Sequence, residues 1–224
     1  MAVKTKSGAK EALCDPAKSD AAAIGFRPHS GWASLIAIAG PVAAPHVIER
    51  RRIELADRSI RGSVQPYHFA EEMELKRAER WIAQCLNSSE GLAREAIEGT
   101  VDKLRQQGYR VSVSGLVRSS ARPLPELASV LASHALIHTA EGEMFRDALT
   151  RASTHHGLTV MGVKERELFD RCASDLGMPT PEIESRLAEL GRMLGPPWRQ
   201  DEKFATLVAW LALAAQAAKG ARKS

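Results

Sequence analysis

Gly31-Trp-Ala-Ser-Leu-Ile-Ala-Ile-Ala-Gly-Pro41 is the stretch that decides the fold, because it is almost continuously apolar between two glycines. Such a run between turn residues predicts a strand at the centre of a sheet, covered on both faces. The next stretch, Val47 to Leu55, follows within hairpin distance and contains Glu49 and three consecutive arginines, so much of it faces water. We expect the two to pair as an antiparallel hairpin that runs from the sheet centre towards its edge.

Further along the chain, helical and strand patterns alternate. Strands are predicted at 111–117 and 158–163, and each is entered after a helical stretch, at 71–107 and at 141–155. Further helices are predicted at 126–133, 165–176, 181–194 and 201–218. The polar stretch 57–68 leaves room for a short extra strand, and Asn87 to Gly91 leaves open a split or kink in the first long helix.

This order of elements predicts an α/β fold. Strands entered after a helix pair in parallel through right-handed crossovers, whereas the opening hairpin is antiparallel. The fold class that follows is a mixed sheet opened by an antiparallel hairpin, with helices on both faces.

Length and composition indicate one domain. The chain has 224 residues and is 44% hydrophobic, which suffices for a buried core. We expect residues 1–22 to be a disordered leader, 23–218 a single α/β domain and 219–224 a basic C-terminal tail.

The formal charge of +4 lies at the two ends of the chain. Lys219, Arg222 and Lys223 lie near the C-terminus, and residues 1–22 hold four lysines against three acids. The remainder is formally neutral, so the folded body lacks the basic surplus of a dedicated nucleic-acid binder.

Cysteine usage and hydropathy indicate the compartment. Cys14, Cys85 and Cys172 are too far apart for a C-x-x-C motif, and their odd number argues against a disulfide framework. A reducing, cytoplasmic location fits this pattern. The longest apolar run, 205–215, is shorter than the ~18 residues that a membrane span needs, so we expect no membrane partner.

The second half of the chain resembles the RuvC-type Holliday-junction resolvases, a branch of the ribonuclease-H-like superfamily. The resemblance covers the pattern of residues 141–218, and near the start Gly25-Phe-Arg-Pro28 and Gly31-Trp-Ala33 are similar to the family's opening motifs. Its segments here are Ala148-Leu-Thr-Arg-Ala152, Gly157-Leu-Thr-Val-Met-Gly-Val163, Lys164-Glu-Arg-Glu167, Gly195-Pro-Pro-Trp198 and Asp201-Glu-Lys-Phe-Ala205.

The resemblance implies a site in which carboxylates hold two magnesium ions between them. Arg27 stands where the family has its first-strand aspartate, Arg118 where an acid is expected, and Phe204 where the last helix has its second aspartate; Asp201 remains. We therefore hypothesise that an internal pair between Arg27 and Asp201 replaces the metal site, and we expect no metal or other cofactor. The candidate relic site comprises Arg27, His29, Arg118, His138, Glu143 and Asp201.

Histidine spacing offers a separate metal hypothesis. His134, His138 and Glu141 have the spacing that places three ligands on one helical face. Thr139 and Gly142 weaken a continuous helix there, so we favour the interpretation that these histidines line a loop between two helices.

The densest basic cluster gives the candidate nucleic-acid-binding residues, Arg50, Arg51 and Arg52. Strand alternation places Arg50 and Arg52 on one side and Arg51 on the other, and nearby acids also allow a plain solvated edge.

Three functions stay open. The first is a non-catalytic or strongly diverged ribonuclease-H-like protein that binds a partner such as nucleic acid. The second is a metal-dependent nuclease that uses Mg²⁺ in an unorthodox site, with Glu143, His138 and Asp201 as its acids and ligands. The third is a protein-interaction scaffold, and assembly with a protein partner or into a homo-oligomer is left open.

Overall fold

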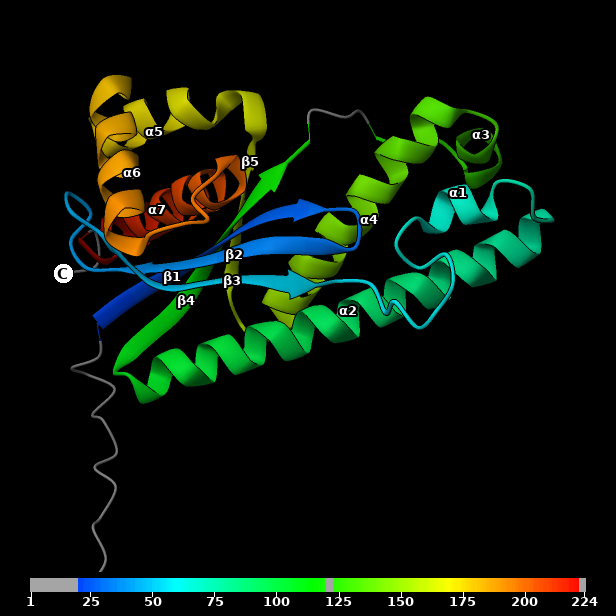
Figure 1. The fold of residues 1–224 in the computed structure, drawn as a ribbon, viewed down its shortest axis with the longest axis horizontal. Coiled ribbons are helices and arrows are strands. Elements are labelled where there is room, and N and C mark those ends of the chain that lie inside the picture. The colour runs from blue at the N-terminus through cyan, green and yellow to red at the C-terminus, as the bar shows by residue number, and fades with distance from the viewer. Residues whose placement is uncertain (1–19, 120–122, 222–224) are drawn as a thin grey trace, which may run out of the picture.

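A computed structural model describes residues 20–119 and 123–221 (Figure 1). A five-stranded sheet in the order β3-β2-β1-β4-β5 forms its centre. The strands are β1 (Asp20–His29), β2 (Trp32–Ala39), β3 (His46–Glu54), β4 (Tyr109–Arg118) and β5 (Thr159–Lys164). Strands β1, β2 and β3 pair antiparallel, whereas β4 is parallel to both β1 and β5. The predicted mixed sheet with its antiparallel hairpin is therefore confirmed.

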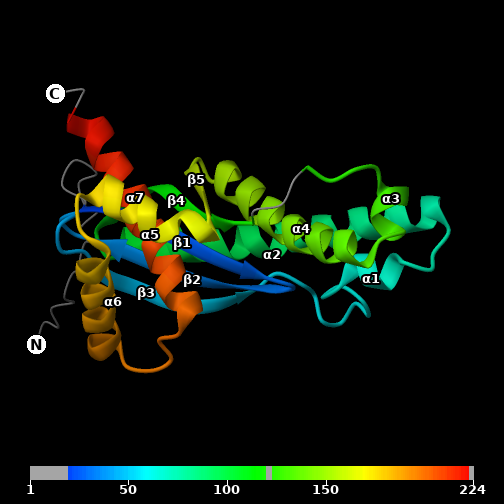
Figure 2. The ribbon, with the colours of Figure 1, turned by 90° about the horizontal axis from the view of Figure 1, so that it is seen from above.

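Helices cover both faces of the sheet, as predicted (Figure 1). One face carries α2 (Leu75–Gln106) and α4 (His134–His155), and the other carries α5 (Leu168–Leu176), α6 (Thr180–Leu194) and α7 (Gln200–Ala221). The short helices α1 (Pro66–Ala70) and α3 (Leu127–Leu131) pack beside α2 and α4 at the end of the molecule remote from the C-terminus (Figure 2). The 3₁₀ turn η2 (Glu165–Glu167) follows β5 directly.

Strand β1 is the main departure from the predicted elements. It begins at Asp20, so residues 20–22 of the expected leader belong to the sheet, and residues 1–19 lie outside the described part. Its first half is rich in alanine, which is a poor strand former on its own. Ala22 and Ala23 are nonetheless fully buried between β2 and β4, so tertiary packing overrides the local preference.

The structure also decides two alternatives that the sequence left open and corrects two predicted helix bounds. The described residues 57–68 form turns and the start of α1 and hold no strand. Helix α2 runs without a break through Asn87 to Gly91, and Ser89 is buried on its inner face. Helix α4 begins at His134, and α7 continues to Ala221, so residues 219–221 of the expected tail are helical.

Helix α7 lies directly on the central strands. A Cβ atom at Gly25 would stand 1.9 Å from the carbonyl oxygen of Ala205, and one at Gly115 would stand 2.1 Å from that of Val208. Glycine at both positions therefore permits the close approach. By length and composition α7 is the one described helix that could cross a membrane, yet half of its apolar window is buried in the fold, which is typical of a core helix.

Two of the three cysteines lie in the described part of the chain, and both are free and buried. Burial raises the pKa of the Cys85 thiol to about 11 and that of the Cys172 thiol to about 12. Both side chains are therefore unreactive packing groups at neutral pH.

Candidate functional site

The parallel strands β1, β4 and β5 end at the same edge of the sheet, which we call the crest. In open α/β sheets, ligands bind outside the carboxyl ends of the strands. The crest is built from Arg27 at the end of β1, Arg118 at the end of β4, Glu165 after β5, Glu143 and Arg146 on α4, and His29 and Asp201. Arginines and carboxylates are therefore interleaved where the parallel strands end.

Asp201 reaches the crest because α7 packs directly on β1. Its Oδ1 lies 2.7 Å from Nε2 of His29. A carboxylate only accepts hydrogen bonds, so we assign the donated proton to Nε2 of His29. The His29 ring stacks on Trp32, with centroids 4.3 Å apart and an interplanar angle of 11°, and this contact fixes its orientation.

Arg27 pairs mainly with Glu165, which corrects the predicted partner. Its Nη2 lies 2.8 Å from Oε2 of Glu165, whereas its Nε is 4.0 Å from Oδ1 of Asp201, too far for a hydrogen bond. The sequence did not reveal that the end of β5 lies within reach of the end of β1. The Arg27 side chain is only 15% exposed, so its charge is fixed in place beside both acids.

Glu143 is the other acidic centre of the crest. It accepts from Nη2 of Arg118 at 3.2 Å, from Nη1 of Arg146 at 3.5 Å, and from the hydroxyl of Ser119. The carboxylate of Glu143 is 18% exposed and therefore depends on these donors in place of water.

Arg146 links the two halves of the crest. Burial lowers its pKa, and the guanidinium groups of Arg27 and Arg118 act in the same direction, whereas Glu143 and Glu165 raise it. Arginine remains charged under all these influences. One electrostatic network therefore extends from Arg118 through Arg146 to Arg27.

The carboxylates of Glu143, Glu165 and Asp201 already have partners among the protein's own side chains. Magnesium takes oxygen ligands and a two-metal site shares carboxylates between its ions. Here Glu143 and Glu165 are paired with guanidinium groups and Asp201 with an imidazole. Within the described residues, one group of three candidate ligands lies within 4.8 Å; it consists of His68, His134 and His138 and includes none of the crest carboxylates.

Five of the six predicted relic-site residues lie at the crest: Arg27, His29, Arg118, Glu143 and Asp201. His138 does not, because it lies in the first turns of α4 with its ring against His68 and His134. The sequence analysis predicted no site role for Glu165 or Arg146. Two signals could have identified them: Glu165 is an acid two positions after a predicted strand, and Arg146 is a basic residue three positions after Glu143.

The three consecutive arginines of β3 have separate roles. Arg50 donates from Nη1 to the carbonyls of Gly195 and Pro197, each at 2.7 Å, and so ties down the loop before α7. Arg51 points to the opposite face and donates to the carbonyl of Ala96 on α2, in agreement with the predicted alternation.

Arg52 lies over Trp32, with its Cζ 4.0 Å from the ring centroid. His29 stacks on the same ring at a similar distance, so Trp32 contacts both side chains. An open groove of about 440 Å³ lies beside them and adjoins the crest. It is lined by Trp32, Ser34, Arg50, Arg51, Arg52, Pro197, Arg199, Asp201 and Glu202.

Comparison with known proteins shows the fold. No protein-family model and no curated protein matches the sequence. Among solved structures, Thermus thermophilus RuvC in complex with Holliday junction substrate is similar with a TM-score of 0.53 and 9% identity, over 88% of this chain and 95% of that chain. A second Thermus thermophilus RuvC structure has a TM-score of 0.53 and 11% identity, over 88% and 96%. The chain therefore has a ribonuclease-H-like fold of the RuvC type, as the sequence resemblance implied.

Proposed function

We propose that this protein binds the sugar–phosphate backbone of nucleic acid in the groove beside the crest and does not cleave it. The observation that carries the proposal is that the acids Glu143, Glu165 and Asp201 each have a cationic or imidazole partner. A fixed guanidinium beside a carboxylate repels a divalent ion and occupies the oxygen atoms that would hold it. Without a metal pair, the two-metal route to phosphodiester cleavage is closed.

The groove supplies the binding surface. Arg52 and Arg199 line it with exposed side chains, and RuvC, which shares the fold, has been solved with a Holliday junction. Guanidinium groups match phosphate oxygens in a bidentate geometry. The ring of Trp32 already contacts His29 and Arg52, so we expect contacts to phosphates more than base stacking on this ring.

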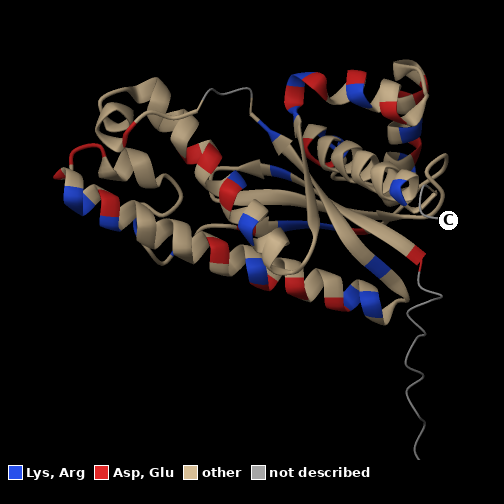
Figure 3. Cartoon of the chain, turned by 180° about the vertical axis from the view of Figure 1, so that it is seen from behind, with Lys and Arg blue, Asp and Glu red and all other residues tan. Residues whose placement is uncertain are grey.

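Charge compensation limits the expected affinity. Acidic and basic residues are intermixed along α2 (Figure 3). At the crest, positive and negative side chains are close to equal in number. Few phosphates are then neutralised, so we expect binding that weakens steeply with salt and discriminates by shape more than by base sequence.

The test is fluorescence anisotropy with labelled four-way junction, duplex and single-stranded DNA at several salt concentrations, followed by gel analysis after incubation with MgCl₂. We expect salt-sensitive binding to the junction and intact DNA. Arg52→Gln and Arg199→Gln should each weaken binding and reduce the salt slope by about 1.

Arg105→Gln is the matched control, since Arg105 is an exposed arginine paired with Asp102 at the far end of α2. It removes the same charge and should leave binding unchanged. If the wild-type chain binds none of the three DNAs, the proposed binding is refuted. Magnesium-dependent cleavage that is lost in Asp201→Asn would refute the absence of catalysis.

A further inference from the structure

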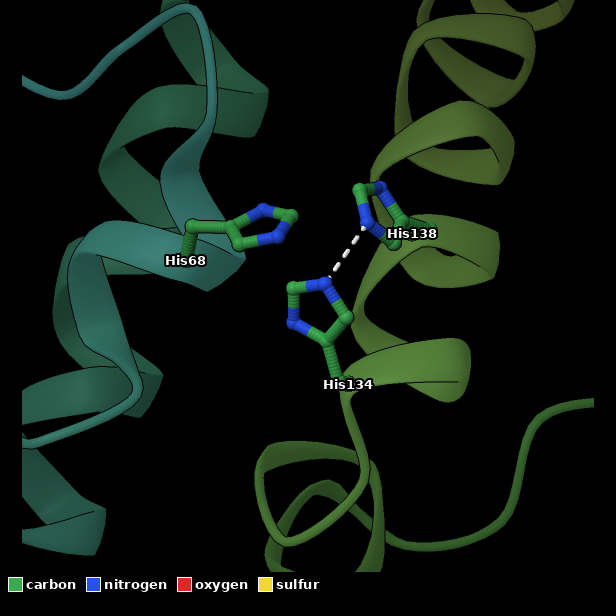
Figure 4. A group of neighbouring side chains, drawn as sticks. All are labelled: His68, His134 and His138. Atoms are coloured by element: carbon green, nitrogen blue, oxygen red, sulfur yellow. Dashed lines mark hydrogen bonds between the residues drawn. The ribbon is translucent and has the colours of Figure 1, made fainter.

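Three histidines from two separate helices meet at the end of the molecule formed by α1 and the start of α4. His68 lies on α1, and His134 and His138 lie one turn apart on α4. The three rings point towards one another (Figure 4), with centroid separations of 4.6 to 5.2 Å. This arrangement corrects the sequence interpretation, because His134 and His138 lie in a helix rather than in a loop.

A buried acid orients the first of these rings. Glu141 is 1% exposed, and its Oε1 lies 2.9 Å from Nδ1 of His68 and 3.2 Å from the backbone nitrogen of the same residue. Because the carboxylate accepts both bonds, we assign the ring proton of His68 to Nδ1, which leaves the lone pair on Nε2. A carboxylate behind a histidine in this way is the usual outer partner of a metal-ligating imidazole.

The spacing of the ring nitrogens suits one ion. One nitrogen from each of the three rings lies within 4.8 Å of the others, and the Nε2 atoms of His134 and His138 are 3.1 Å apart. Two imidazoles on a tetrahedral zinc at about 2.05 Å hold their nitrogens about 3.3 Å apart. Binding one ion therefore requires rotation of the exposed His134 and His138 rings, so that all three lone pairs point to one position.

We propose that His68, His134 and His138 bind one Zn²⁺ ion, with Glu141 as the outer partner that orients His68. Three imidazoles are ligands typical of zinc and other late first-row divalent ions, and they are unsuited to Mg²⁺. His134 and His138 are exposed, so the fourth position of the ion faces solvent and is open to water or a small anion. The ion also ties α1 to α4 and stabilises the native state over the unfolded one.

The test is calorimetric titration of the purified full chain with ZnCl₂, together with its melting temperature with and without zinc. We expect one ion per chain and a higher melting temperature in zinc. His134→Ala and His138→Ala should lose most of the affinity, and Glu141→Gln should lower it about 10- to 100-fold. Cobalt substitution adds a spectroscopic readout, since a four-coordinate Co²⁺ site absorbs visible light far more strongly than a six-coordinate one.

His155→Ala is the matched control, because His155 is a histidine on the last turn of the same helix, outside the cluster. It should bind zinc as the wild type does. The exposed positions of His134 and His138 make their variants safe for folding, and unchanged melting temperatures without zinc verify this. Absence of zinc binding by the wild type, or equal binding by the doubly substituted His134→Ala/His138→Ala chain, would overturn the proposal.

Discussion

Glu143 is the acid with the most donors at the crest. It accepts from two arginines and a serine hydroxyl while only 18% exposed. Its loss would leave Arg146, whose side chain is 12% exposed, without its nearest counter-charge. Removing one partner of a half-buried pair costs more than the pair itself contributes, because the remaining charge is poorly hydrated.

We predict that Glu143→Gln lowers the free energy of unfolding by about 1–3 kcal/mol. Urea denaturation at neutral pH measures the change. The control is Glu167→Gln, which removes an exposed acid paired with Lys164 and Arg166 and should alter stability by less than about 0.5 kcal/mol. Equal effects of the two variants would show that the crest ion pairs contribute no more than surface pairs.

For single residues, the sequence identified most of the crest but predicted the wrong salt-bridge partner for Arg27. The positions of Arg27, Arg118 and Asp201 followed from the family resemblance, which aligns residues along the chain. The partner of Arg27 did not follow, because Glu165 lies 138 positions away and reaches it only through the sheet register. His68 was missed for the same reason, since only the packing of α1 on α4 brings it to His134 and His138.

Among the elements, α7 positions the crest because two glycines let it touch the sheet. Its backbone passes over Gly25 of β1 and Gly115 of β4, so the first turn of the helix lies over the end of β1. Asp201, in this first turn, therefore lies within hydrogen-bond distance of His29. The site therefore depends on the absence of two Cβ atoms in the core.

We predict that Gly115→Ala lowers the free energy of unfolding by about 1–3 kcal/mol or more, because the new methyl group would stand 2.1 Å from the Val208 carbonyl oxygen. The measurement is again urea denaturation. Gly99→Ala on α2 is the control, since nothing lies within 4 Å of that position. It should stabilise the chain by up to about 1 kcal/mol, and a stabilised Gly115→Ala would contradict the close approach of α7.

Helices and strands were predicted correctly where the spacing of apolar residues and the flanking turn residues indicated the same element. The hairpin of β2 and β3 and the parallel strands β4 and β5 are close to their predicted bounds. Strand β1 was not predicted as an element because its alanines carry no strand signal, and a split of α2 was left open because Asn87 to Gly91 favour a break. In both cases burial against neighbouring elements determines the outcome.

For the whole molecule, the fold and the charge pattern lead to different expectations. The fold is of the RuvC type, and one solved RuvC holds a Holliday junction. The crest, in contrast, places Arg27, Arg118 and Arg146 among the carboxylates. Because of the second observation, we propose that this chain binds nucleic acid without metal-dependent cleavage.

Calorimetric titration with MgCl₂, on the wild-type chain and on Asp201→Asn, tests this inference most directly. Magnesium prefers oxygen ligands, so the histidine cluster does not interfere. We predict no binding heat at the crest in either protein, because guanidinium and imidazole groups already pair with its carboxylates. Tight magnesium binding by the wild type that disappears in Asp201→Asn would contradict the inference that the crest holds no metal pair.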